Sequence, residues 1–240
     1  MTLDVAKARR DLAHKLRASA KPGGDAWLQH YVGSPYPVLG LTTAQHRAIQ
    51  SGFAKAHPDL TAKEVNALAA AVRKGPTTEE KWLAVGLVDR YAKVLDDASW
   101  RLLDRFVDDS IGWGLCDGLG VGPVSKMARA KPARFRELIA WAKSPNPWRR
   151  RVALYALRDF VYAKEFDKPF QLIECVLYDE EFWVQRAVGT WLRECWKRDR
   201  RRTEAFLRKH VEGLPKVVIT VATERAPKAF REELRRNRGP

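Results

Sequence analysis

Residues 146–158 (NPWRRRVALYALR) and residues 181–193 (EFWVQRAVGTWLR) carry one pattern twice, 35 positions apart. The matched positions hold Trp148 and Trp183, Arg151 and Arg186, Leu157 and Leu192, and Arg158 and Arg193. A period of 20 to 50 residues is typical of proteins built from stacked structural repeats. The pattern therefore predicts an all-α fold, a right-handed helical solenoid of HEAT- or armadillo-like repeats.

The spacing of apolar residues and the start and stop signals predict helices almost throughout the chain and no strand hairpin. Thr77 with Glu80, and Asn146 with Pro147, are typical of helix starts, and Ser110 and Asp179 are further candidate caps. We expect one HEAT-like domain over residues 1–240, with an amphipathic helix in roughly residues 1–20 and a basic end over 224–240. The expected helices are 3–19, 25–32, 43–56, 61–73, 78–94, 98–109, a short one carrying Trp113, 123–130, 133–143, 146–163, 168–178, 180–197, 202–211, 215–223 and 227–236.

The composition indicates a folded protein with a polyanionic partner. The chain has 44 Lys and Arg against 29 Asp and Glu, a net charge of +15, which favours nucleic acid, with an anionic membrane surface as the second candidate. The cysteines form no CxxC pair and the histidines are scattered, so we expect a reducing compartment and neither a metal nor a cofactor. Without an apolar run of about 18 residues or a secretion signal, we expect a cytoplasmic, nucleoid-associated monomer that does not enter a membrane.

The repeated stretches place arginines beside tryptophans on one side of each helix. Residues three and seven apart share a helical face, so Trp148 lies with Arg151, and Trp183 lies with Arg186 and Arg193. Guanidinium groups on stacked repeats can pair with phosphate oxygens in forked geometry, and Arg150 widens that surface. The alternative is that the tryptophans pack between repeats and the arginines are solvated or stack on them.

Trp113 lies 35 residues before Trp148, but its block keeps only the tryptophan and places Asp117 one helical turn later. The spacing brings an indole and a carboxylate onto one helical face. A carboxylate beside basic residues could stabilise the positive charge that a deoxyribose develops during cleavage of an N-glycosidic bond. The alternative is that Asp117 caps a turn beside Gly118 and Gly120.

Several stretches together resemble the AlkD-like DNA alkylation-repair glycosylases. They are Trp113–Asp117 (WGLCD), Trp148–Arg151 (WRRR), Val184–Glu194 (VQRAVGTWLRE), and Tyr31 followed by 39–42 (LGLT) and Arg47, so the similarity extends from about residue 25 to about residue 220. The resemblance implies HEAT-like repeats and removal of N3- and N7-alkylated purines from double-stranded DNA, without base flipping, in base excision repair. It makes Asp117 the catalytic aspartate and places Trp113 against the sugar of the lesion. It implies DNA contacts by Tyr31, Arg47, Arg151 and Arg193.

The chain departs from this family at two positions. Thr190 stands where the family usually has a second tryptophan, and Trp191 is one position late, about 100° further around the helix. Thr190 thus removes half of the aromatic clasp, and we assign Thr190 and Trp191 to the DNA surface. Gly114 replaces an acidic residue often found after the first tryptophan. The alternatives are a non-catalytic DNA-binding protein of the same fold and a helical-repeat adaptor for acidic protein partners.

Overall fold

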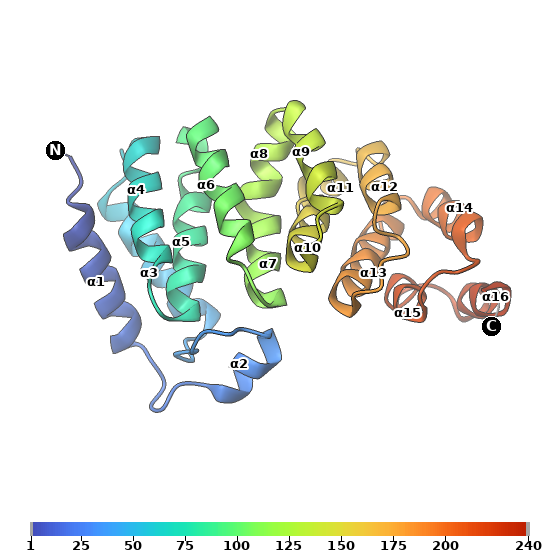
Figure 1. The fold of residues 1–240 in the computed structure, drawn as a ribbon, viewed down its shortest axis with the longest axis horizontal. Coiled ribbons are helices and arrows are strands. Elements are labelled where there is room, and N and C mark those ends of the chain that lie inside the picture. The colour runs from blue at the N-terminus through green and yellow to red at the C-terminus, as the bar shows by residue number, and fades with distance from the viewer. Residues whose placement is uncertain (1, 239–240) are drawn as a thin grey trace. The chain divides into compact units, whose positions relative to one another are not determined.

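The computed structural model describes residues 2–238, which form helices joined by short connections and contain no strand. The chain divides into two compact units, residues 1–127 and residues 128–240. Within each unit successive helices pack side by side, as in helical-repeat proteins (Figure 1). The predicted all-α, helical-repeat fold class is confirmed, whereas a single domain over 1–240 stays a prediction.

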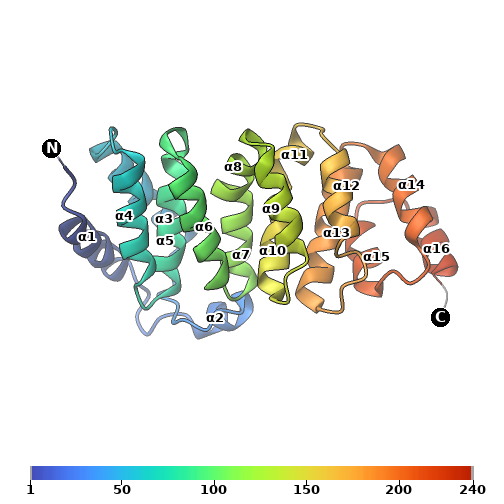
Figure 2. The ribbon, with the colours of Figure 1, turned by 45° about the horizontal axis from the view of Figure 1, so that its top comes forward.

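The first unit is built around α5, which packs against α4 on one side and against α3 and α7 on others (Figures 1 and 2). α2 also contacts α7, although the two helices are far apart in the sequence. The elements of this unit are α1 (Val5–Ala18), α2 (Ala26–Val32), α3 (Thr43–Ala56), α4 (Ala62–Arg73), α5 (Thr78–Arg90), the 3-10 turn η1 (Ala92–Val94), α6 (Asp97–Asp108), α7 (Trp113–Leu119), the π-helical turn η2 (Gly120–Val124) and α8 (Ser125–Ala130), which crosses into the second unit.

The second unit is centred on α13, which packs against α10, α14 and α15. A Cβ at Gly189 of α13 would lie 2.6 Å from the Cβ of Val221 and 3.1 Å from the carbonyl oxygen of Val218, so glycine lets α13 and α15 approach closely. The helices of this unit are α9 (Ala133–Ala142), α10 (Pro147–Tyr155), α11 (Arg158–Tyr162), α12 (Asp167–Glu174), α13 (Phe182–Trp196), α14 (Arg200–His210), α15 (Lys216–Ala222) and α16 (Lys228–Asn237).

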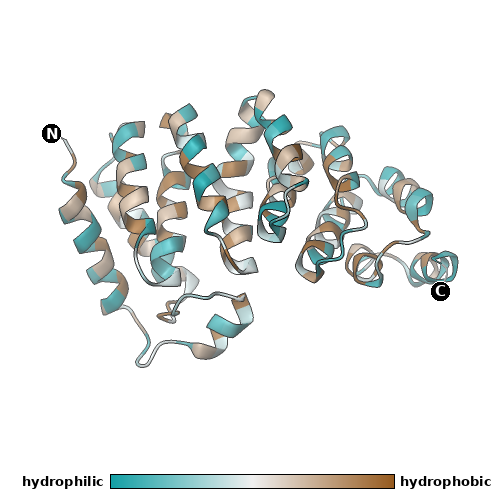
Figure 3. Cartoon of the chain, viewed as in Figure 1, coloured by the Kyte–Doolittle hydropathy of each residue, from teal (hydrophilic) through white to brown (hydrophobic). Residues whose placement is uncertain are grey.

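Apolar and polar residues alternate along the helices with helical periodicity, which Figure 3 shows as brown and teal bands on the same ribbons. In α1, Ala8, Leu12 and Leu16 are buried at spacings of four, and the basic residues between them are exposed. Burial of such stripes drives the packing of each unit, because an amphipathic helix is stable only when its apolar side leaves water.

Most helix starts follow the sequence signals. Thr77 forms the predicted capping box with Glu80, and Asn146 accepts a hydrogen bond from the amide of Trp148 with Pro147 in the first turn. Two predicted caps are wrong. Ser110 donates to the carbonyl oxygen of Phe106 and α7 begins after Gly112, while Asp179 lies two residues before the cap of α13 and pairs with an arginine.

Three predicted helices are shorter than expected. The helix expected over 78–94 ends at Arg90 and is followed by η1, and the one expected over 146–163 is divided into α10 and α11. The helix expected over 168–178 ends at Glu174. In each case an apolar residue beyond the helix end is still buried, as Tyr91, Val161 and Leu177 are, although Val94 is exposed.

Candidate functional site

Three aromatic side chains of α2 and α7 form a cluster on the surface of the first unit, which we call the aromatic cluster: Trp27, Tyr31 and Trp113. The rings of Trp27 and Tyr31 are stacked, with centroids 5.1 Å apart and planes 8° apart. Trp113 meets Tyr31 edge to face at 5.1 Å. Trp27 is 70% exposed and Tyr31 is 52% exposed, so two large aromatic faces are open to a ligand.

The first turn of α7 is held tightly against the end of α2. The indole Nε1 of Trp113 donates to the carbonyl oxygen of Tyr31 at 2.6 Å. Gly112, which immediately precedes the helix, has a φ of +88°, and a Cβ there would lie 2.3 Å from the carbonyl oxygen of Gly33. Glycine at position 112 therefore sets the distance between the two helices, and with it the edge-to-face contact in the aromatic cluster.

Gly114 is required by the same close approach. Its carbonyl oxygen accepts a hydrogen bond from Nε1 of Trp82 at 3.0 Å, and a Cβ on Gly114 would lie 2.9 Å from the Cβ of Val32 and 3.3 Å from the Trp82 ring. The acidic side chain that the resemblance would place here has no room. The departure from the family pattern at Gly114 thus follows from how α2, α5 and α7 pack.

The connecting segment, residues 33–42, fixes α2 to the start of α5. The fully buried carboxylate of Glu79 accepts from the amides of Leu39 and Gly40, both at 2.9 Å. Thr78 donates its hydroxyl to the carbonyl oxygen of Tyr36 at 3.1 Å and its amide to that of Pro37 at 2.9 Å. Buried polar groups with full partners specify one arrangement, so α2 is positioned by α5 as well as by α7.

His46 supports the same region from α3. Its Nε2 lies 3.1 Å from the carbonyl oxygen of Glu79, and its Nδ1 lies 2.9 Å from the side-chain nitrogen of Gln50. A neutral imidazole that donates from Nε2 and accepts at Nδ1 satisfies both contacts. Burial lowers the pKa of His46 from its ordinary value of 6.5, against the opposing effect of Glu79, and so favours this neutral form.

Asp117 lies in the same short helix as Trp113, one turn further on, and is half-buried. The helix continues two residues beyond Asp117 and runs on into η2, so the carboxylate stands inside a helix and not at a turn. Asp117 takes part in a further interaction within the protein. The neighbouring Gly118 is exposed, with open space where a Cβ would be. The spacing thus places an indole and a carboxylate on one side of α7.

The structure places the Arg151 guanidinium against α13, and its assignment to the DNA surface stays a prediction. Arg151 is only 3% exposed. It donates from Nη1 to the carbonyl oxygen of Trp183 and from Nη2 to the Tyr155 hydroxyl at 3.1 Å, and it stacks on the Tyr155 ring at 4.8 Å. In this conformation Arg151 joins α10 to α13, and Trp183 packs beside it at 5.8 Å, as the packing alternative held.

Three further residues assigned to the DNA surface are engaged inside the second unit. Arg150 pairs with Asp179 through Nε at 2.6 Å and Nη2 at 3.0 Å, and its Nη1 donates to the carbonyl oxygens of Ser144 and Pro145. Arg193 pairs with Glu224. Trp191 is 3% exposed and meets Tyr155 edge to face at 5.7 Å. In this conformation the Trp191 ring packs inside the second unit, and its assignment to the DNA surface stays a prediction.

The other assigned residues remain accessible. Arg186 is exposed on α13, and Thr190, half-buried one turn later, donates its hydroxyl to the carbonyl oxygen of Arg186 at 2.8 Å. Trp148 is half-buried at the start of α10, and Arg47 is exposed on α3. Their assignment to the DNA surface stays a prediction, because helical spacing could not separate a face turned to water from one turned to the next helix.

The sequence analysis did not identify Trp27, which is more exposed than Tyr31, the other α2 residue of the aromatic cluster. The signal was present, because Trp27 and Tyr31 are four residues apart in a seven-residue helix and so share a face. It also missed Glu79 and Thr78, whose partners are about 40 positions away in the sequence.

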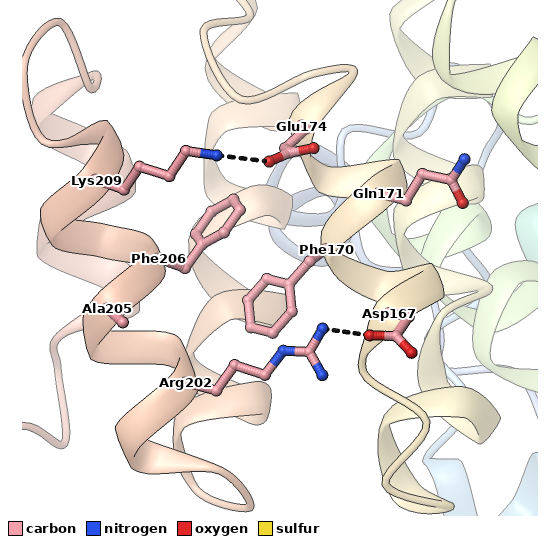
Figure 4. A pocket seen from close by; sticks show the side chains of 8 residues that line it. All are labelled: Asp167, Phe170, Gln171, Glu174, Arg202, Ala205, Phe206 and Lys209. Carbon is pink, nitrogen blue, oxygen red and sulfur yellow. Dashed lines mark hydrogen bonds and ion pairs between the residues drawn. The ribbon is translucent and has the colours of Figure 1, made fainter.

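A separate hollow of about 420 Å³ lies between α12 and α14 of the second unit (Figure 4). Phe170 and Phe206 face one another across it, with ring centroids 4.7 Å apart. At its edges Arg202 pairs with Asp167, and Lys209 lies 3.8 Å from Glu174. The charges are balanced and already paired, so this hollow presents no group poised for catalysis.

Two other kinds of site are absent from residues 2–238. No group of three or more histidine, cysteine or carboxylate side chains there is arranged to hold a metal ion. None of the helices in this range is both long and apolar enough to cross a membrane.

Comparison with known proteins identifies relatives by family and by fold. The model of a family described as DNA alkylation repair enzyme matches residues 12–226. A predicted DNA alkylation repair enzyme from Enterococcus faecalis shares the fold with a TM-score of 0.75 at 18% identity, over 88% of this chain and 98% of that one. AlkD2 from Streptococcus mutans superposes with a TM-score of 0.61 at 17% identity, over 75% of this chain and 89% of that one. No curated protein matches the chain in sequence.

Proposed function

The chain belongs to the DNA alkylation repair enzyme family, and from this premise we propose that it hydrolyses the N-glycosidic bond of cationic alkylated purines in double-stranded DNA. The observation that carries the proposal is the arrangement around α7. Trp113 and Asp117 share one face of this helix, Tyr31 lies directly beside Trp113, and Trp27 stacks on the other side chain of α2, Tyr31.

The chemistry needs one carboxylate. A purine alkylated at N3 or N7 already carries a positive charge, so it departs as a neutral base with the electron pair of the glycosidic bond and needs no general acid. The deoxyribose left behind has oxocarbenium character, which the Asp117 carboxylate stabilises by its charge. A water molecule oriented by Asp117 then adds to the anomeric carbon, and its proton passes to the carboxylate and on to solvent.

The aromatic cluster would hold the sugar of the lesion while this happens. The faces of Trp27 and Tyr31 are apolar and rigid. Tyr31 contacts Trp113, and Trp27 stacks on Tyr31. Packing deoxyribose against such faces removes apolar surface from water and brings the reacting carbon to Asp117 without turning the base out of the helix.

The net charge of +15 supports binding to the DNA backbone. Arg47 and Arg186 are exposed and would pair with phosphates directly. We assign Arg150, Arg151 and Arg193 to positioning, since each joins helices of the second unit through intramolecular contacts. A cytoplasmic, nucleoid-associated monomer that acts in base excision repair fits these roles.

The test is the release of 7-methylguanine from methylated double-stranded DNA at enzyme excess. Asp117→Asn keeps the shape of the side chain and removes the charge, so we expect release to fall at least 100-fold while DNA affinity is kept. Asp59→Asn removes the charge of an exposed carboxylate outside the site and serves as the control, with release unchanged. Equal release by the native chain and Asp117→Asn would refute the assigned chemistry.

Thr190 favours a second candidate, a non-catalytic DNA-binding protein. The position lacks the aromatic side chain that the family resemblance would place there, and Trp191 is buried. If neither the native chain nor Asp117→Asn releases base, and both bind duplex DNA with steep salt dependence, this second function replaces the first. Absence of duplex binding at any salt concentration would leave the adaptor for acidic protein partners as the remaining assignment.

A further inference from the structure

A second hollow, of about 270 Å³, lies between α15 and α16 of the second unit. We call it the basic hollow, and the residues that line it are Lys216, Ile219, Thr220, Arg235 and Arg238. Three of the five carry a positive charge and none is acidic. Three like charges around one cavity repel each other in the free protein, so an anion in the hollow would relieve that repulsion.

Three carboxylates that are near the hollow in the sequence are paired elsewhere. Glu224 pairs with Arg193, Glu233 pairs with Arg208 at 2.6 Å, and Glu232 lies 3.7 Å from Lys228. The basic hollow is therefore not neutralised by the acids of its own helices. The contrast with the hollow between α12 and α14 is direct, because there each cation has a carboxylate partner.

One of the cations is fixed in place. Arg238 donates from Nε to the carbonyl oxygen of Leu214 at 2.7 Å, which orients its guanidinium at the edge of the hollow that it lines. Lys216 and Arg235 approach from separate helices and are exposed. A held guanidinium with two flexible cations around it suits an anion that has several acceptor oxygens, as phosphate has.

The size of the hollow restricts which ligands it can hold. Its volume is below the roughly 300–1,000 Å³ of sites that enclose a drug-sized molecule. It suits a single phosphate group with a little of the adjoining chain. The site also lies partly outside the family match, which ends at residue 226, before Arg235 of α16 and Arg238, the residue that follows this helix.

We propose that the basic hollow binds a phosphate group, and that in the DNA complex this group is a backbone phosphodiester. The source of the phosphate rests on the proposed function, whereas the phosphate chemistry rests on the hollow alone. The site would hold the DNA backbone at the α15–α16 end of the second unit.

The experiment compares two double variants that remove the same charge. Lys216→Gln with Arg235→Gln empties the basic hollow of its two exposed cations and leaves Arg238 on Leu214. The matched control is Arg225→Gln with Lys228→Gln, which neutralises two exposed cations nearby that do not line the hollow. Circular dichroism and thermal unfolding confirm that both variants fold. Affinity for unmodified duplex DNA is then measured as a function of salt concentration.

A plot of log affinity against log salt concentration has a negative slope, and loss of one phosphate contact lowers the magnitude of that slope by about 0.9. We expect this change for the hollow variant and no change for the control. The proposal is overturned if both variants lower the slope equally, since that would be a general effect of charge, or if the hollow variant leaves it unaltered.

Inorganic phosphate distinguishes the possible sources of the group. Phosphate at constant ionic strength should raise the thermal midpoint of the native chain and of the control variant, and should not raise that of the hollow variant. Phosphate stabilisation without any change in the DNA slope would overturn the assignment to the backbone phosphodiester. Release of 7-methylguanine is measured separately. If the hollow variant has a shallower salt dependence but the native chain releases no base, phosphate binding by the basic hollow is supported and only the proposed glycosidic chemistry is rejected.

Discussion

Replacement of Gly112 by alanine should disrupt the aromatic cluster without touching any of its rings. Gly112 has a φ of +88° and a ψ of 147°, a backbone conformation that is essentially restricted to glycine. An added Cβ would lie 2.3 Å from the carbonyl oxygen of Gly33 and 2.6 Å from that of Val32. Both of these are backbone atoms, so no side-chain rotation can relieve the contact.

The magnitude follows from these two effects. An L-residue in this conformation costs about 1–3 kcal/mol, and forcing a methyl group into a filled site costs about 1–3 kcal/mol more. We therefore expect Gly112→Ala to lower the free energy of unfolding of the first unit by about 2–6 kcal/mol. Any relaxation that moves α2 away also breaks the hydrogen bond from Trp113 to Tyr31, so base release should fall as well.

Urea denaturation followed by circular dichroism measures the stability, and base release measures the function. The control is Gly118→Ala in the same helix, where a Cβ meets open space. That variant should gain about 0.5–1 kcal/mol, because alanine favours a helix over glycine. If Gly112→Ala is as stable and as active as Gly118→Ala, the close approach of α2 and α7 does not position the cluster.

Four other outcomes are expected. Gly189→Ala should lower the unfolding free energy by about 1–3 kcal/mol in urea, because its Cβ would overlap α15. Since burial lowers the pKa of His46, the unfolded chain takes up the proton first, so the urea midpoint should fall as pH drops below about 6.5, and less so in His46→Gln. Burial raises the pKa of Cys195 to about 12, so a thiol reagent should label exposed Cys175 in the native protein and label Cys195 only after unfolding. Trp27→Ala should reduce kcat/KM for base release about 2- to 10-fold, the equivalent of about 0.5–1.5 kcal/mol of aromatic packing, and an unchanged value would exclude Trp27 from the site.

The helices could be predicted well where their signals are local. Thr77 with Glu80 and Asn146 with Pro147 define helix starts through contacts within three residues, and both starts are where the sequence places them. The start of α7 could not be found in this way. It depends on Gly112 meeting Gly33, a contact between segments that are far apart in the sequence.

In the candidate site, too, the features set by local spacing could be predicted and those set by a neighbouring helix could not. The sharing of one helical face by Trp113 and Asp117 follows from helical spacing alone. Helical spacing also grouped Arg151 with Trp148, but it could not reveal that the Arg151 side of α10 faces α13, where the guanidinium finds the Trp183 carbonyl oxygen and the Tyr155 hydroxyl. A periodic pattern identifies a face, and only the neighbouring helix decides whether it meets water.

The hydrogen bond between Trp113 and Tyr31 joins residues 82 positions apart, which has a consequence for the order of folding. α2 is a seven-residue helix that depends on partners in α5 and α7, so it cannot form stably before those helices are in place. We expect it to dock late during folding and, for the same reason, to detach first in the native protein, before the helices beneath it open. Amide hydrogen exchange should then be faster in α2 than in α5, and DNA lying across the aromatic cluster should slow it.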